Sequence, residues 1–184
     1  MSETVVVVLA DRSTVSAIAD LGSALGWTRT SLTKRSHVVM ANLTWSAGRT
    51  RVGYYEDHCA EVRYLLLEGP GAKSLAEELA GKLDHCDLES TLERAAESSD
   101  PGESIRCLGR LSVMAPADPD PRFIEIWQVK FRHAERAVRR AAIRTAYSLP
   151  WPEMAALVEQ RLERDKRLAP QLEELREYLK RSPS

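Results

Sequence analysis

The sequence predicts an α+β protein in which a sheet domain is followed by an array of helices. Strand-like runs of apolar and β-branched residues end at residue 67, and no strand pattern follows Cys86. The second half instead repeats apolar residues at three- and four-residue spacings, which is typical of helices that bury one face. With 184 residues and 43% hydrophobic side chains, the chain can form one large or two small cores. We expect two domains, residues 1–85 and 86–184.

The N-terminal domain is predicted to have the order β-α-β-β-β-α, with a four-stranded sheet and two helices. Thr4–Ala10 is an unbroken β-branched and apolar run, the pattern of a strand that is covered on both faces or placed centrally in a sheet. The helix that follows can be capped by Asp11 or Ser13, and Gly26 ends it.

Residues 28–36 are interpreted as a polar link before three further strands and a helix. The strands are predicted over Val38–Trp45, Arg51–Glu56 and Glu61–Leu67, and the helix over Lys73–Leu83. Short turn-compatible stretches separate these three strands, so they should form an antiparallel meander.

Two His-Cys dipeptides, His58-Cys59 and His85-Cys86, are the arrangement in this domain that could carry chemistry. Imidazole and thiolate are ligands that zinc accepts, but adjacent residues point apart and make a poor tetrahedral site. A cysteine nucleophile would also need an orienting group and an oxyanion donor, and none can be named. We therefore expect no catalytic residue, no metal and no cofactor. The odd number of three cysteines favours reduced, buried thiols.

Six helices are predicted in the C-terminal domain. Their apolar stripes begin at Leu88, Ile105, Phe123, Val138, Met154 and Leu168. Asp100 and Asp120 each precede a proline, a combination that caps and starts a helix. Trp127 and Phe131 fall on an apolar stripe and should lie in the core. The small residues of the stripe that starts at Val138 should let two helices approach closely.

The segment Asp118–Leu149 resembles the HEAT-repeat family. Pro121 and Pro152 both open first helices and lie 31 residues apart, the kind of period that signals stacked hairpins. The match lies in the DPDP turn, residues 118–121, and in Val138, Arg139, Ala141, Ala142 and Ala146 of the second helix. It is good for this hairpin, suggestive for residues 88–115 and weak for residues 152–179. HEAT proteins are scaffolds that bind proteins and sometimes nucleic acid, and the resemblance implies the same here without assigning a catalytic residue.

Four arginines of one predicted helix, Arg136, Arg139, Arg140 and Arg144, are candidate binding residues. Arg136, Arg140 and Arg144 are one turn apart and could form a ridge that binds nucleic acid or an acidic partner. The simpler interpretation is a solvated helix face, with one arginine paired to Asp118 or Asp120. Trp151, between two prolines, is either an exposed contact residue or a plug in the seam between hairpins.

Charge and hydropathy limit the classes of function that this chain can have. The formal net charge is −1. Residues 86–120 contain 3 basic and 8 acidic side chains, whereas residues 121–184 contain 14 basic and 9 acidic ones. This excess of positive charge in the C-terminal part is smaller than that of a dedicated nucleic-acid binder. Val5–Ala10, the longest apolar run, is far shorter than the roughly 18 residues of a membrane span. We expect a soluble, cytoplasmic, non-enzymatic adaptor, scaffold or immunity-type partner that binds another protein, with nucleic-acid binding as the alternative.

Overall fold

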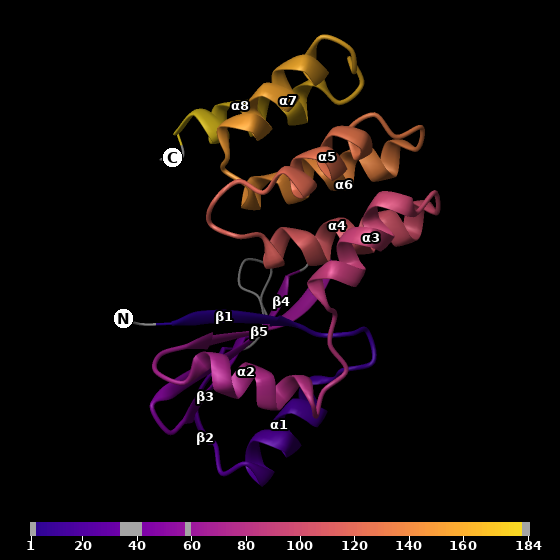
Figure 1. The fold of residues 1–184 in the computed structure, drawn as a ribbon. Coiled ribbons are helices and arrows are strands. Elements are labelled where there is room, and N and C mark those ends of the chain that lie inside the picture. Colours follow the sequence, from indigo (N-terminus) through magenta and orange to yellow (C-terminus); the bar gives the residue numbers. More distant parts are fainter. Residues whose placement is uncertain (1–2, 34–41, 58–59, 182–184) are drawn as a thin grey trace. The chain divides into compact units, whose positions relative to one another are not determined.

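The computed structural model describes residues 3–33, 42–57 and 60–181, and the chain divides into two compact units (Figure 1). Residues 1–87 form the sheet unit and residues 88–184 form the helical unit. The sheet unit joins strands with two helices, and the regular elements described in the helical unit are all helices. The α+β class predicted from the sequence is confirmed.

Five antiparallel strands form the sheet in the order β1-β5-β4-β3-β2. The strands are β1 (Thr4–Val8), β2 (Thr28–Thr33), β3 (Asn42–Ala47), β4 (Thr50–Asp57) and β5 (Val62–Glu68). Consecutive strands from β2 to β5 are neighbours, which confirms the meander. Residues 38–41 of the strand predicted over Val38–Trp45 lie outside the described residues.

One expectation about the sheet was wrong. The polar link contains strand β2, which pairs with β3 although its sequence is TRTSLT, so the sheet has five strands and not four. Strand β1 pairs with β5 at one end of the strand order, so of the two interpretations of its apolar run the central position is excluded. Its apolar sequence is explained by burial towards its C-terminal end, where Val7 and Val8 are buried and Cys86 N donates to the Val8 carbonyl.

Helices α1 (Val15–Ala24) and α2 (Ala72–Ala80) lie on one face of the sheet, as Figure 1 shows. Alternate residues of the strands, among them Val52 and Leu65, form the core with Ile18 and Leu79 of these helices. The N-cap of α1 is Thr14, whose Oγ1 accepts from Ala17 N, and not Asp11 or Ser13 as expected.

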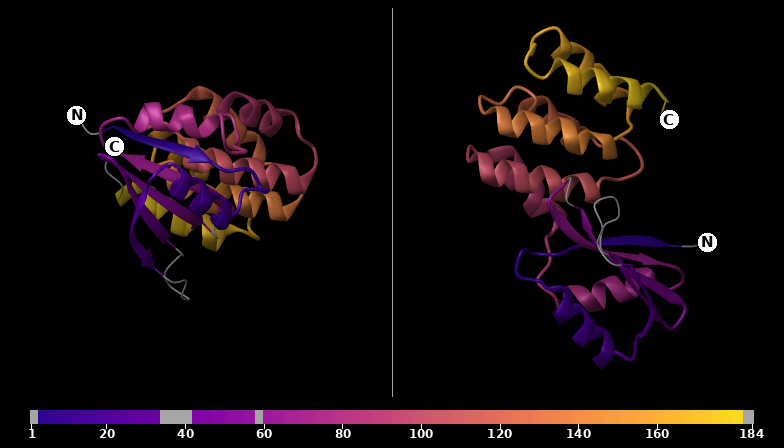
Figure 2. Two further views of the ribbon diagram at one scale, coloured as in Figure 1. Left: turned by 90° about the horizontal axis from the view of Figure 1, so that it is seen from below. Right: turned by 180° about the vertical axis from the view of Figure 1, so that it is seen from behind.

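The helical unit stacks three antiparallel helical hairpins. The helices are α3 (Leu88–Glu97), α4 (Pro101–Met114), α5 (Pro121–Lys130), α6 (Arg136–Thr145), α7 (Pro152–Leu162) and α8 (Ala169–Arg181), with a short 3-10 helix η1 (Ala146–Ser148) after α6. The six predicted helices are confirmed. Figure 2 shows from behind that the hairpins α3–α4, α5–α6 and α7–α8 lie one upon another.

Caps and small residues explain this stack. Asp100 and Asp120 accept hydrogen bonds from the backbone N–H groups of Glu103 and Arg122, and a proline follows each of them. Ala141 and Ala142 of α6 belong to the core of the unit, and α4 packs along α6 more closely than α3 packs along α5. Helices approach each other most closely where their facing side chains are small. The contact between α3 and α5 is therefore looser than the contact between α4 and α6.

None of the helices in the described part of the chain has the length and apolar character that crossing a bilayer requires.

Candidate functional site

An open apolar groove lies between α3 and α5, where the helices are less closely packed. It has a volume of about 350 Å³. Successive turns of the two helices line it: Glu89, Leu92, Glu93, Ala95 and Ala96 from α3, and Arg122, Glu125, Ile126 and Val129 from α5. Leu92 and Ile126 form the buried floor, whereas the side chain of Val129 is 57% exposed. An apolar depression of this size is the usual form of a binding site.

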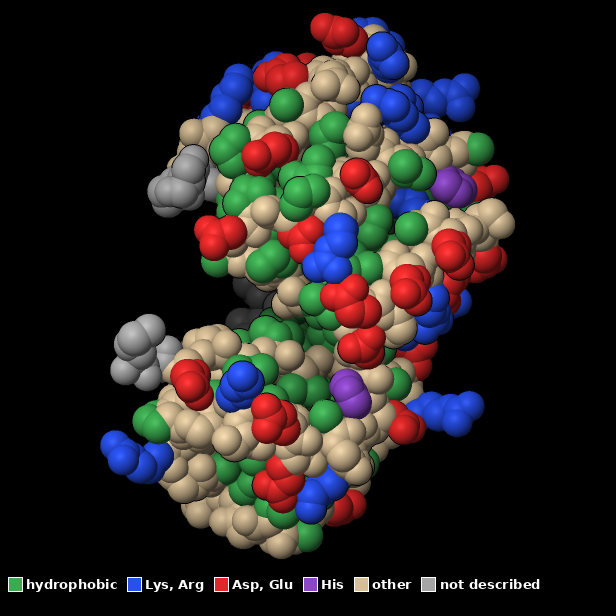
Figure 3. Space-filling model, in the orientation of Figure 1, with side chains coloured by type: hydrophobic (Ala, Val, Ile, Leu, Met, Phe, Trp, Pro, Cys, Tyr) green, Lys and Arg blue, Asp and Glu red, His purple; other side chains and the backbone are tan. Residues whose placement is uncertain are grey.

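The rim of this groove is acidic. Three carboxylates, Glu89, Glu93 and Glu125, stand against one arginine, Arg122. Arg122 already pairs with Asp120 at 2.8 Å and with Glu89 at 2.9 Å. Glu93 and Glu125 form no ion pair with any residue that the structure describes. Figure 3 shows acidic side chains gathered over α3 on the face that it draws.

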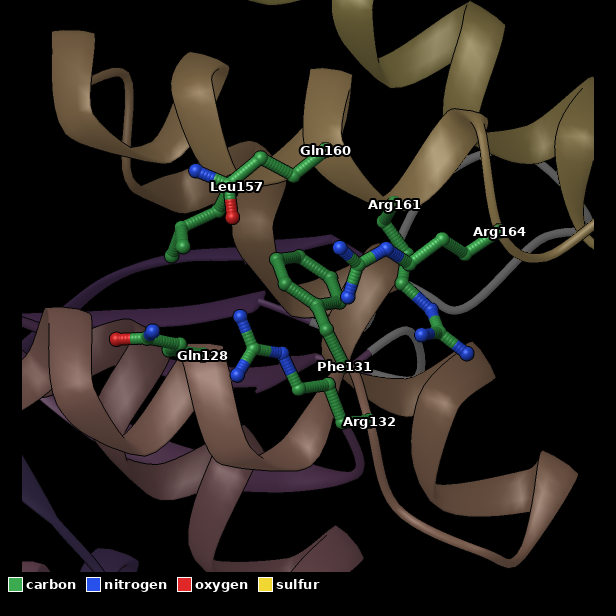
Figure 4. Close-up of a pocket in the computed structure, with 7 residues that line it drawn as sticks. All are labelled: Gln128, Phe131, Arg132, Leu157, Gln160, Arg161 and Arg164. Carbon is green, nitrogen blue, oxygen red and sulfur yellow. The ribbon is translucent and has the colours of Figure 1, made fainter.

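A second, much smaller pocket of about 10 Å³ lies between α5 and α7 and is basic. Its lining contains three arginines, Arg132, Arg161 and Arg164, with Gln128, Phe131, Leu157 and Gln160 (Figure 4). No carboxylate is among these lining residues. Arg161 Nε is buried and makes no hydrogen bond within the described ranges. Guanidinium groups bind phosphate and carboxylate oxygens in pairs. A cavity of this size holds about one water molecule, however, and Arg161 NH2 already lies 3.4 Å from Asp165 Oδ2, so the pocket does not enclose an oxyanion.

The four arginines predicted to bind do not act as one surface. Arg136, Arg140 and Arg144 are exposed on α6, but Arg139 is turned into the unit. Its Nε donates to Asp165 Oδ2 at 2.7 Å, and its NH1 group donates to the carbonyls of His133 and Ala134. Arg139 is therefore a structural link between hairpins, and its partner is Asp165 and not Asp118 or Asp120.

Asp165 is held ionised by two arginines. Burial alone would raise the pKa of this carboxyl, but hydrogen bonds from Arg139 and Arg161 outweigh that effect and lower the pKa below its usual value. The side chains of Arg139 and Asp165 are only 13% and 6% exposed. A pair that is shielded from water in this way is disrupted at a considerable cost, unlike the exposed pairs of Arg122.

Trp151 fills the contact between two helical hairpins and is not a surface contact residue. Its side chain is 4% exposed, its ring meets Phe123 edge-on at a centroid distance of 5.8 Å, and Nε1 donates to the Ala117 carbonyl at 3.3 Å. Trp127 and Phe131 are also buried, which confirms their predicted place in the core. Trp151 and Arg139 are therefore largely shielded from solvent, whereas Arg136, Arg140 and Arg144 remain exposed candidates for contact.

The cysteines and histidines of the described residues are not assembled into a site. Cys107 is fully buried, and burial together with a hydrogen bond to Glu103 raises the pKa of its thiol to about 11. His85 is exposed, and its Nδ1 lies 3.2 Å from the Leu83 carbonyl. His58 and Cys59 lie outside the described residues. Within those residues, no three histidine, cysteine, aspartate or glutamate side chains are placed to hold a metal ion.

The sequence did not reveal the α3–α5 groove, because its two walls are separated by a complete helix and two turns. One signal was available: Val129 lies off the stripe formed by Phe123, Trp127 and Phe131, and so had no predicted place in the core. Comparison with known proteins gives no further guidance, since no family model, curated protein or solved structure matches this chain.

Proposed function

We propose that this chain is a non-enzymatic protein-binding module, and that its helical unit is a HEAT-like repeat stack that engages a partner protein. The single observation that carries the proposal is the apolar groove between α3 and α5, in which Val129 remains 57% exposed. Burying a valine side chain contributes roughly 1.5 kcal/mol or more, so a partner that covers it gains free energy from a surface already formed.

The repeat part of the proposal is supported by the way the hairpins are linked. Helices of the same order in each hairpin lie side by side, α3 by α5 and α4 by α6. Arg139, the arginine of the VRxAA motif, bonds to Asp165 in the turn of the following hairpin. The non-enzymatic part is supported by Cys107, because a buried thiol with a raised pKa is a poor nucleophile.

Site-specific photo-crosslinking in cells that express the protein naturally tests this function. A benzophenone amino acid at Val129 should give a discrete heavier adduct with one partner protein, identified by mass spectrometry. The same probe at Tyr178, which is 42% exposed on α8, controls for general surface reactivity in the same unit. Val15 on α1 provides the control in the sheet unit. Adducts from Val15 alone, with none from the helical unit, would overturn the proposal.

Nucleic-acid binding remains the second candidate function, and the exposed arginines of α6 and beside the α5–α7 pocket favour it. Arg132 and Arg164 line that pocket and are exposed, as are Arg136 and Arg140 on α6, and none of these four arginines forms an ion pair with any described residue. Arg139 is paired with Asp165, which weakens this alternative because one of the four arginines on α6 is then not available to bind a phosphate. Protein binding is therefore the leading proposal.

A further inference from the structure

The groove between α3 and α5 has a shape that restricts what can occupy it. Its lining residues recur every three or four positions along each wall, from Glu89 to Ala96 and from Arg122 to Val129. Seven residues of helix advance about 10 Å, so the groove is two helical turns long. Both walls are helices whose backbone groups bond within the helix, and neither offers a free strand edge to an incoming segment.

An incoming segment must therefore satisfy its own backbone hydrogen bonds, which favours an occupant that is itself helical. Apolar side chains of such a helix, spaced three or four residues apart, would enter the floor at Leu92 and Ile126 and cover Val129. The volume of about 350 Å³ suits a few anchoring side chains and not a large interface.

The rim determines the charge of the occupant. Glu93 on one wall and Glu125 on the other form no ion pair with any described residue, and Arg122 is already neutralised by Asp120 and Glu89. Carboxylates on both sides of an apolar floor attract cations on both sides of an apolar stripe. From this complementarity we propose that the groove binds a basic amphipathic helix of a partner protein, an inference that rests on the proposed protein-binding function.

Two other occupants fit less well. A second copy of this chain would have to present its basic helix α6, but the apolar face of α6, including Val138 and Ala142, is buried in the core of its own unit. An anionic membrane surface would be repelled by Glu93 and Glu125. The groove therefore matches a helix supplied by another protein.

Selection of peptides from an unbiased library is the test. A phage-displayed library of random 16-residue peptides is panned on the full chain, and enriched peptides are synthesised for fluorescence anisotropy and circular dichroism. We expect peptides that carry apolar residues three or four positions apart, flanked by lysine or arginine, and that become helical when bound. The double variant Glu93→Lys with Glu125→Lys, and separately Val129→Asp, should weaken their binding at least tenfold.

The matched control reverses two exposed carboxylates away from the groove, Glu163→Lys with Glu173→Lys, and should leave affinity within twofold. All variants are first compared with the unaltered chain by thermal unfolding. Enriched peptides that are acidic or neutral, peptides unaffected by the groove variants, or a selection that enriches nothing would overturn the inference. If a natural partner still crosslinks from the helical unit in any of these cases, the inference fails while the proposed function stands.

Discussion

Arg139 Nε donates a 2.7 Å hydrogen bond to Asp165 Oδ2, and this ion pair joins the second helical hairpin to the third. Both side chains are largely shielded from water, and the same guanidinium also binds the carbonyls of His133 and Ala134. One arginine thus fixes the turn of its own hairpin and the turn of the next. Such a link positions the successive hairpins of a stack.

Asp165→Asn should lower the free energy of unfolding by about 3 kcal/mol, because Arg139 then remains buried without its counter-charge. Urea unfolding followed by circular dichroism measures the difference. Asp118→Asn is the control, since Asp118 is exposed and its substitution should cost less than about 0.5 kcal/mol. Equal stability of the two variants would mean that the Arg139–Asp165 pair contributes little.

The contribution of Asp165 should also depend on pH. Its pKa is lower in the folded chain than in the unfolded chain, so its contribution is present above the unfolded value of about 3.9 and is lost as the pH falls through the folded value. The stability difference between the unaltered chain and Asp165→Asn should be constant from pH 7 to pH 5 and shrink below pH 4. Urea titrations at pH 7, 5, 4 and 3 measure it, and a difference that grows at pH 3 would contradict the assignment.

Lys130 is buried, and its ammonium group ties α5 to the first hairpin. Its Nζ donates to the Ser98 carbonyl at 3.0 Å and to Ser104 Oγ at 3.1 Å. Lys130→Met should lower the free energy of unfolding by about 1 kcal/mol at pH 7, because both acceptors lose their donor. Lys180→Met, at an exposed position on α8, should change it by less than about 0.5 kcal/mol. Chemical unfolding of both variants tests the difference.

Burial lowers the pKa of Lys130, which gives its contribution a defined sign. Above the lowered folded pKa and below about 10.4, the unfolded state binds more protons, so stability rises with pH in that window. The unaltered chain should therefore gain stability over Lys130→Met as the pH is raised from 7 through the folded pKa towards about 10. A stability difference that narrows over this range would show that the folded pKa of Lys130 is not lowered.

Trp151 should behave as a core residue. Trp151→Ala should cost about 3–5 kcal/mol through the cavity it leaves, and Trp151→Phe about 1–2 kcal/mol through loss of the hydrogen bond to Ala117. Tyr178→Ala removes an aromatic ring that is 42% exposed and packs on Tyr147, and should cost less than about 1.5 kcal/mol. Thermal unfolding ranks the three variants, and a mild Trp151→Ala phenotype would return this residue to the surface candidates.

The nucleic-acid alternative predicts salt-dependent retention of the purified chain on heparin and on duplex DNA. Arg136→Glu with Arg140→Glu, and separately Arg132→Gln with Arg164→Gln, should lower the salt concentration needed for elution, because each phosphate contact contributes to the salt dependence. Arg29→Glu with Arg49→Glu in the sheet unit makes the same charge change as the first pair and serves as its control. Passage of the unaltered chain through both columns at low salt would eliminate this alternative.

Much of the fold was predictable because it depends on local signals. The helices of the second half can be recognised from the spacing of their apolar residues and from the Asp-Pro caps at residues 100–101 and 120–121. These signals act within one helical turn. Strand β2 was missed because TRTSLT carries no alternating apolar pattern. It is a strand because its backbone pairs with β3, and Ser31 Oγ bonds to Thr44 Oγ1. Whether a segment pairs in this way depends on a neighbouring strand, and the local sequence of the segment does not reveal that neighbour.

The candidate site, like the fold, could be predicted from the sequence only in part. The sequence by itself determined that α6 is a basic, amphipathic helix and that its alanines allow close packing. Only the tertiary structure decided that Arg139 faces Asp165, 26 residues away, while Arg136 and Arg140 face solvent. It also decided that Trp151 fills a seam and that α3 and α5 stand far enough apart to leave Val129 exposed. Periodicity indicates which face of a helix is buried, whereas the partners of individual charged and aromatic residues depend on how separate helices pack.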